Sequence, residues 1–398
     1  MKISSIICEY NPFHNGHLYA INKIKSELKP DAVVCIMSGN FTQRGEAAVM
    51  DKYTRAKHAV KAGADMVLEL PAAFATAPAE IFAKGAIKLL SALKAENTLC
   101  FGVESGNEKS LFKTAAALSN ESKQFKADLK EELARGSTLA KAKYAALEKF
   151  NEREPNSGID LSLVSSPNNI LALEYARAIL EGKHDLGVFL IERNGNAYHA
   201  EKLKKGENPS AAAIRAAIDS GKIKRVKNFV PPYVFNDLPS FVPRADDMIL
   251  TSLLTRDKKE IKEIFDCTEG LENRIKVLCK DSFTLTDLLK RLATRRYTQT
   301  RLSRITLSAL LGIKKEDVLK FLKSDLYLKV LAINASKTDL LSDLSPDIPF
   351  ITRKSDANLL KGAAKACFET DVFAGEVYSH ITKKHQNEFA TLFVENDV

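Results

Sequence analysis

The 398-residue sequence lacks any uninterrupted apolar run of about 18 residues, so we expect no membrane span. Its first residues carry one lysine and a six-residue apolar stretch that soon meets Glu9 and Pro12, which is not the pattern of a secretory signal. The six cysteines are widely spaced and form neither a C-x-x-C pair nor a Cys/His cluster, which excludes the usual zinc patterns and favours reduced, buried thiols. These absences predict a protein of the cytoplasm.

The composition is that of an ordinary soluble globular protein, with 45% hydrophobic and 27% charged residues. The length allows two or three domains, each with a sizeable core. The 59 Lys and Arg residues exceed the 50 Asp and Glu residues by nine, which suggests a polyanionic partner without identifying it.

Buried strand patterns alternate with helix patterns over the first 200 residues, which predicts crossover connections and a parallel, doubly wound, Rossmann-like α/β sheet. Ligands of such sheets bind at the carboxyl ends of the strands. Polar loops follow four of the expected strands there, at residues 9–17, 38–46, 102–106 and 193–199. The expected strands cover residues 3–8, 32–37, 66–70, 98–103 and 187–191.

The second half of the chain is different in character. Residues 226–245 carry four prolines with little periodicity, and we expect a domain junction there, between an α/β domain at 1–225 and a helical domain at 246–398. We expect no convincing set of strands after residue 246. Residues 271–330 hold 14 Lys and Arg against 6 Asp and Glu, which makes the helical domain a candidate for binding RNA.

The stretch that organises the first half contains His14-Asn15-Gly16-His17, between the first expected strand and an amphipathic helix. Unpaired N–H groups and the helix dipole favour an anion at such a helix start, and two imidazoles add donors for a phosphate. This is the H-x-G-H arrangement of the nucleotidyltransferase superfamily, in which a nucleotide α-phosphate is attacked and pyrophosphate leaves. The plainer alternative is a strand-turn-helix with two surface histidines.

Two further helix starts could reach the same sheet edge. Asn168 and Asn169 begin an amphipathic helix, and either could contact a ligand, although such residues usually serve as caps. Ser210 begins another helix, with Arg215 five residues on, and together a helix start and a guanidinium can bind phosphates. Alanine-rich helices with one arginine are common, so the role of Arg215 stays open.

A basic run at residues 291–304 suggests an RNA-binding face. Tyr297, Arg301 and Arg304 share a helical face opposite Leu302 and Ile305, which suits RNA phosphates and one stacked base. The alternative is the solvated face of a helical bundle.

Four stretches in chain order make this sequence resemble the tRNA(Met) cytidine acetate ligase family of bacteria: residues 9–17 (EYNPFHNGH), 37–46 (MSGNFTQRGE), 166–171 (SPNNIL) and 296–302 (RYTQTRL). Residues 210–215 depart from the superfamily pattern S-S-T-x-I-R, because Ala211 and Ala212 lack hydroxyl groups. A phosphate contact there must come from the backbone or from Arg215.

The resemblance implies an ATP-dependent ligase that forms acetyl-adenylate from acetate and acetylates N4 of the wobble cytidine of elongator tRNA(Met). It implies a nucleotidyltransferase-like ATP-binding domain at 1–225 and a tRNA-binding domain at 246–398. It implies catalytic roles for His14 and His17, which would stabilise charge on the phosphates. Mg²⁺ is expected with ATP, without a dedicated carboxylate cage. No general base for the cytidine amine and no oligomeric state emerges. The residues that the resemblance assigns to ATP are Ile7, Cys8, Glu9, Tyr10, Asn11, Pro12, Phe13, His14, Asn15, Gly16, His17, Leu18, Tyr19, Ala20, Gly102, Asn168 and Arg193.

Two rival functions remain open. A nucleotidyltransferase acting on a small metabolite would leave the basic helical half without a role. A non-catalytic RNA-binding protein with a vestigial nucleotide pocket would leave both histidines unexplained. A class I aminoacyl-tRNA synthetase shares the superfamily, but no K-M-S-K-S-like loop is present.

Overall fold

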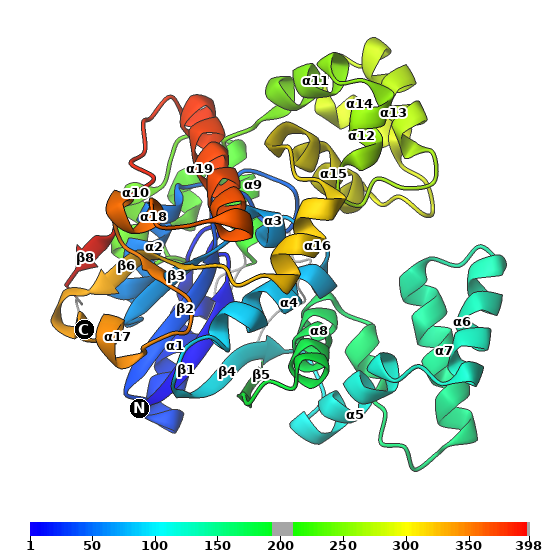
Figure 1. Cartoon of the computed structure of the whole chain (residues 1–398), viewed down its shortest axis with the longest axis horizontal. Coiled ribbons are helices and arrows are strands. Elements are labelled where there is room, and N and C mark those ends of the chain that lie inside the picture. Colours follow the sequence, from blue (N-terminus) through cyan, green and yellow to red (C-terminus); the bar gives the residue numbers. More distant parts are fainter. Residues whose placement is uncertain (193–209, 396–398) are drawn as a thin grey trace.

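The computed structural model describes residues 1–192 and 210–395 (Figure 1). Within these residues eight strands form one sheet, in the order β5-β4-β1-β2-β3-β6-β7, with β8 paired to β6. The five strands expected in the first half are all present and parallel to one another, which confirms the predicted sheet. The strands are β1 (Lys2–Cys8), β2 (Ala32–Ser38), β3 (Met66–Leu70), β4 (Glu96–Val103), β5 (Gly187–Glu192), β6 (Leu328–Asn334), β7 (Phe350–Ile351) and β8 (Leu392–Val394).

Helices cover both faces of this sheet, because successive strand side chains point to opposite sides. In β2, Val33 and Cys35 join the core beneath α1 (Asn15–Leu28), α2 (Lys52–Lys61) and α9 (Ala211–Asp219). Val34 and Ile36 join the core on the other face, beneath α4 (Ala79–Leu90), α8 (Pro167–Gly182) and α19 (Gly362–Thr382). The sheet is therefore doubly wound.

The remaining helices extend this framework. A group after the proline-rich segment gathers at one end of the molecule, beside the sheet, and α6 and α7 project from another side (Figure 1). That group comprises α11 (Asp246–Thr255), α12 (Lys258–Glu263), α13 (Leu271–Leu278), α14 (Leu285–Leu292) and α15 (Gln299–Leu311). The next helix, α16 (Lys315–Lys323), packs against α19 and α4. The others are α3 (Ala72–Ala75), α5 (Glu108–Ser119), α6 (Lys123–Ala134), α7 (Leu139–Arg153), α10 (Pro232–Asp237), α17 (Leu340–Asp343) and α18 (Lys354–Ala357).

The expectation that no strands follow residue 246 is wrong. β6 pairs antiparallel with β3 and extends the sheet, and β7 and β8 pair with β6. The strand was missed because Lys329 interrupts its apolar run, as on a solvated helix face. Lys329 is instead buried, with its ammonium 3.1 Å from the Glu69 carboxylate. The domain division at residues 226–245 stays a prediction.

The chain changes direction across the sheet at β1. From β1 it winds to β2 and β3 on one side, and then returns to place β4 and β5 on the other side. The carboxyl ends of β1 and β4 therefore border a topological switch point, where doubly wound sheets bind ligands. Of the helices that the structure describes, none is long and apolar enough to cross a membrane.

Candidate active site

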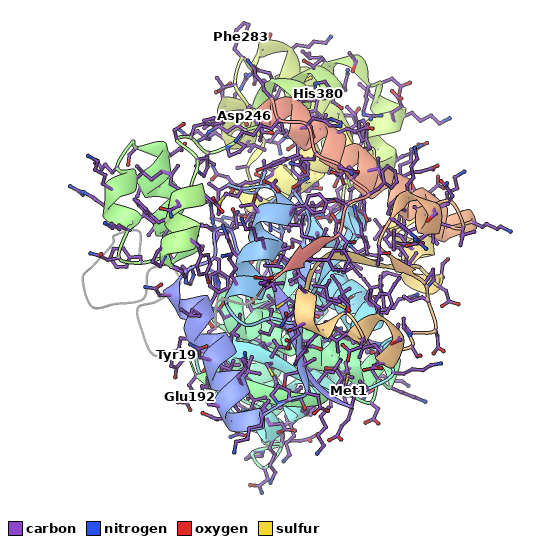
Figure 2. All side chains as sticks on the ribbon, turned by 90° about the vertical axis from the view of Figure 1, so that its left-hand side faces the viewer. Met1, Tyr19, Glu192, Asp246, Phe283 and His380 are labelled. Atoms are coloured by element: carbon purple, nitrogen blue, oxygen red, sulfur yellow. The ribbon has the colours of Figure 1, made fainter. Side chains whose placement is uncertain are left out.

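A cavity of about 400 Å³ opens at this switch point. Its walls come from the ends of β1, β4 and β5, the N-terminal parts of α1, α8 and α9, Phe82 of α4, and the loop after β2. Tyr19 of α1 and Glu192 at the end of β5 both belong to these walls and lie on the same side of the molecule (Figure 2). Polar groups from segments far apart in the sequence thus meet in one cavity.

The two histidines form the start of α1. His14 is the N-cap, and its Nδ1 accepts a hydrogen bond from the Gly16 N–H at 3.1 Å. His17 lies three residues later, and its Nδ1 accepts from the His14 N–H at 3.2 Å. Because each Nδ1 is an acceptor, each neutral ring carries its proton on Nε2. The rings stack with their centroids 3.7 Å apart, and both line the cavity, so the structure brings together the two predicted catalytic side chains.

Buried aromatic rings hold this turn in place. Phe13 is fully buried, and its ring lies 4.8 Å from that of Tyr10. The Tyr10 ring in turn lies 4.9 Å from the His17 ring. The His14 side chain is only 3% exposed, so the motif is built into the core rather than carried on a surface turn. This burial disfavours the alternative of two surface histidines.

The cavity walls include most of the residues expected to bind ATP. Four residues of the motif stretch, Pro12, Phe13, Asn15 and Leu18, are not among the described wall residues, and the side chain of Asn15 instead donates to the Asn228 carbonyl at 3.1 Å. Arg193 lies outside the described residues. The expected residues that do line the cavity are Ile7, Cys8, Glu9, Tyr10, Asn11, His14, Gly16, His17, Tyr19, Ala20, Gly102 and Asn168.

The two asparagines in the first turn of α8 differ in role. Asn169 is 1% exposed and ties α8 to the end of β4, because its Oδ1 accepts from the Glu104 N–H at 2.8 Å. Asn168 lines the cavity, with its Nδ2 2.7 Å from a carboxylate oxygen of Glu104. Of the pair, Asn168 is thus the one placed for a ligand.

The first turn of α9 forms another wall. Ser210 caps the helix by accepting from the Ala213 N–H at 3.2 Å, and Ala211 and Ala212 line the cavity with small side chains. Arg215 also lines the cavity, and its Nη1 donates to the Asn11 carbonyl at 2.7 Å. The helix start and the guanidinium thus meet the histidine turn, as phosphate binding would require.

The loop after β2 supplies wall residues for which the sequence predicted no role. Gln43 and Arg44 line the cavity, and the Gln43 N–H donates to Glu9 Oε1 at 2.7 Å. Burial raises the pKa of the Glu9 carboxyl, while the charges of Arg215, Arg55 and Arg44 oppose that shift. Two signals pointed to this loop: it follows a parallel strand, and its residues belong to the matching stretch 37–46.

The basic face expected at residues 297–304 does not exist as predicted. Tyr297 precedes α15, is 6% exposed, and donates its hydroxyl to the Thr268 carbonyl at 2.7 Å, so it cannot stack on a base. The Arg301 guanidinium lies 4.7 Å above the Tyr297 ring. Arg304 packs against the loop after β2, with its Nη1 3.4 Å from the Gln43 carbonyl, and burial lowers its pKa. Tyr297 and Arg301 thus face the turn at Asp266 and Thr268, and Arg304 faces the loop after β2.

Comparison with known proteins assigns this fold and site to a class. Residues 1–391 match the family described as HIGH Nucleotidyl Transferase, and the chain belongs to that family. The chain is 38% identical over 390 residues to the tRNA(Met) cytidine acetate ligase of Caldanaerobacter subterraneus subsp. tengcongensis, covering 95% of each protein. It is 36% identical to the enzyme of that name from Clostridium perfringens, covering 96% of each. The chain is thus a member of the tRNA(Met) cytidine acetate ligase family.

Two solved structures of a protein named TmcAL have the same fold as this chain. The apo structure of Thermotoga maritima TmcAL has a TM-score of 0.90 at 28% identity, over 98% of this chain and 100% of that one. The structure of the same Thermotoga protein bound with alpha-thio ATP has a TM-score of 0.88 over the same coverage. The whole chain therefore shares one architecture with a protein that binds an ATP analogue.

Proposed function

We propose that this protein is an ATP-dependent ligase that activates acetate and acetylates N4 of the wobble cytidine of elongator tRNA(Met). The observation that carries the proposal is the convergence of two stacked imidazoles, the start of α9 and Arg215 on one switch-point cavity. This convergence occurs in a chain that is 38% identical to a relative named tRNA(Met) cytidine acetate ligase.

The reaction has two steps. An acetate oxygen attacks the α-phosphorus of ATP, and pyrophosphate leaves. The cytidine N4 then attacks the acetyl carbon, and AMP leaves as the carbon–oxygen bond breaks. The cavity supports the first step, because His14 and His17 present donors where charge develops on the phosphates, together with the α9 start and Arg215. Such donors are worth about 10²–10³ in rate each.

The site is compatible with Mg²⁺ that enters bound to the phosphates of ATP. Among residues 1–192 and 210–395, no group of three or more His, Cys, Asp or Glu side chains is arranged to hold a metal ion. Mg²⁺ usually keeps several waters and binds through substrate phosphates with one or two carboxylates, so no protein cage is needed. Glu192, at the end of β5, is a carboxylate in the cavity walls that could meet it. When bound, the ion would neutralise charge on the β- and γ-phosphates.

The tRNA would bind through the helical half. Residues 271–330 hold eight more basic than acidic side chains, and the residues on this segment that expose their charges include Lys280, Lys290, Arg295 and Arg296. Phosphate contacts of this kind provide affinity for RNA without reading its sequence. We place the reaction in the cytoplasm, where ATP and tRNA are available and where the six free cysteines would stay reduced.

Isotope exchange tests this function against the small-metabolite rival. The purified protein should exchange labelled pyrophosphate into ATP only when acetate is present, and it should need no acetyl-CoA. Exchange that depends on a phosphorylated metabolite would instead support the rival. Absence of any exchange under either condition would support the non-catalytic alternative.

A further inference from the structure

One wall of the cavity is held by the helical half of the protein. Gly45, in the loop after β2, has a φ of +74° and packs directly on α15. A Cβ atom at Gly45 would lie 2.5 Å from the Arg304 nitrogen and 2.5 Å from the Ser303 carbonyl carbon. Arg304 also donates to the Gln43 carbonyl at 3.4 Å. The loop that supplies Gln43 and Arg44 to the cavity is therefore seated on α15.

The same loop fixes the carboxylate of Glu9. Oε1 accepts from the Gln43 N–H at 2.7 Å and from the Ser38 hydroxyl at 3.4 Å. The fully buried Arg55 holds the backbone beneath it, with Nη1 2.6 Å from the Glu9 carbonyl and 3.1 Å from the Ser38 carbonyl. Within the described chain, Oε2 of Glu9 accepts no hydrogen bond, although the residue lines the cavity. One carboxylate oxygen is thus oriented by the loop and the other remains for a ligand.

A carboxylate suits some parts of the proposed reaction better than others. It repels phosphates, which the histidines, the start of α9 and Arg215 are suited to bind. It attracts a group with N–H bonds to donate, and in the second step the cytidine amine is such a group. An RNA bound to the helical half would reach the cavity where α15 meets it, which is the edge formed by Gln43 and Arg44.

We propose that Glu9 is the catalytic residue that accepts the N4 proton of the acceptor cytidine, and that Gly45 and α15 position it through Gln43. This inference rests on the proposed function. As N4 attacks the acetyl carbon, the new carbon–nitrogen bond forms, and the carbon–oxygen bond to the adenylate breaks with its electron pair leaving on AMP. The proton released from N4 passes to Oε2 of Glu9 and then to water.

The surroundings of Glu9 fit this role. Burial raises its pKa, which strengthens the carboxylate as a base, and Arg215, Arg55 and Arg44 oppose the shift. A general base typically contributes about 10²–10⁴ in rate.

Glu9→Gln keeps the size and the acceptor for the Gln43 N–H but cannot take a proton. It should slow transfer of labelled acetate from ATP-activated acetyl to elongator tRNA(Met) by about 10²-fold or more. Acetate-dependent pyrophosphate exchange should fall by less than about tenfold. Transfer at the wild-type rate would overturn the proposal, and so would an equal loss of exchange with a raised KM for ATP, since Glu9 would then bind ATP. Lack of exchange in the wild type would instead refute the proposed function.

The role of α15 is tested with a pair of glycines. Gly45→Ala should lower kcat for acetyl transfer at least tenfold more than it lowers pyrophosphate exchange, with little change in the KM for tRNA. Gly312→Ala is the control, because Gly312 has a similar φ of +70° and nothing within 4 Å of an added Cβ. It should affect only thermal stability.

Arg304→Met removes the donor to the Gln43 carbonyl without adding bulk. This second variant tests the positioning role even if Gly45→Ala does not fold. Arg304→Met should likewise lower kcat for acetyl transfer much more than it lowers the rate of pyrophosphate exchange. The positioning role is wrong if Gly45→Ala behaves as Gly312→Ala does, or if a folded Arg304→Met protein transfers acetate normally.

Discussion

The guanidinium of Arg301 grips the carboxylate of Asp266 with two hydrogen bonds, from Nε at 3.0 Å and from Nη2 at 2.8 Å. Asp266 has a φ of 63°, so the pair fastens α15 to a turn with left-handed backbone. A bidentate arginine–carboxylate pair is specific in geometry and stronger than a single ion contact. Arg301 therefore stabilises the helical half, and phosphate binding has to come from side chains that are more exposed.

The first prediction concerns the RNA-binding surface. Replacing Arg295 and Arg296 together with Ala should flatten the salt dependence of tRNA binding, by about 0.7–0.9 in log–log slope for each phosphate that these side chains neutralise. Both side chains are exposed, and that of Arg296 is 68% exposed. Arg301→Lys serves as the control and should lower stability while leaving the slope unchanged. Binding measured across a salt series would contradict this if only Arg301→Lys altered the slope.

The second prediction concerns the phosphate site. His17→Ala should slow acetate-dependent pyrophosphate exchange by about 10²–10³-fold, since the variant lacks one charge-stabilising donor. His17 also completes the capping box of α1, so the free energy of unfolding should fall by about 0.5–2 kcal/mol. A folded variant that exchanges pyrophosphate at nearly the wild-type rate would remove this histidine from the mechanism.

The third prediction concerns a buried cluster of four charges beneath the loop after β2. The Lys52 ammonium lies 2.8 Å from Glu69 and 2.6 Å from Glu388, and Lys329 contacts the same two carboxylates at 3.1 and 3.4 Å. Glu388→Gln leaves buried positive charge uncompensated and should cost about 3–5 kcal/mol in the free energy of unfolding.

The matched control for Glu388→Gln is an exposed carboxylate. Asp347→Asn removes an ion pair with Lys94 whose side chains are 75% and 58% exposed, and it should cost less than about 1 kcal/mol. Similar small losses for both variants in urea unfolding would show that the buried cluster relaxes or hydrates when it is broken.

The fourth prediction concerns pH. Burial and the nearby charge of Glu69 raise the pKa of Asp371 to about 7, from about 3.9 in unfolded chains. Between these values the folded state binds a proton that the unfolded state has released, so this contribution to stability is complete below about pH 4 and is lost as the pH rises through 7. Asp371→Asn should flatten the fall in unfolding free energy between about pH 4.5 and 8. Parallel curves for the two proteins would assign the pH dependence to other groups.

The parts of the molecule predictable from sequence were those governed by local pattern. Buried apolar runs such as that of β2 (Ala32–Ser38) marked the parallel strands, and the position of His14 and His17 between a strand and a helix marked the cavity. Both signals can be read from a few neighbouring residues, because buried strands and helix starts each have a characteristic local sequence pattern.

Features that depend on distant partners were not predictable. Lys329 occupies an interior strand, β6, only because Glu69 and Glu388, far away in sequence, neutralise it. The spacing of Tyr297 and Arg301 predicted an exposed basic face. In the structure Thr268 and Asp266 accept hydrogen bonds from these two side chains. The sequence showed no sign that Glu9 could act as a base, because the groups around its carboxylate, Gln43 and three arginines, come from other segments of the chain.

The most direct test of the central claim is nucleoside mass spectrometry of elongator tRNA(Met) incubated with the purified protein, ATP and isotopically labelled acetate. The account predicts N4-acetylcytidine at the wobble position that carries the label, and none when either acetate or ATP is omitted. Unmodified cytidine in the complete reaction, with the protein folded and the tRNA bound, would contradict it, as would acetylation that requires acetyl-CoA.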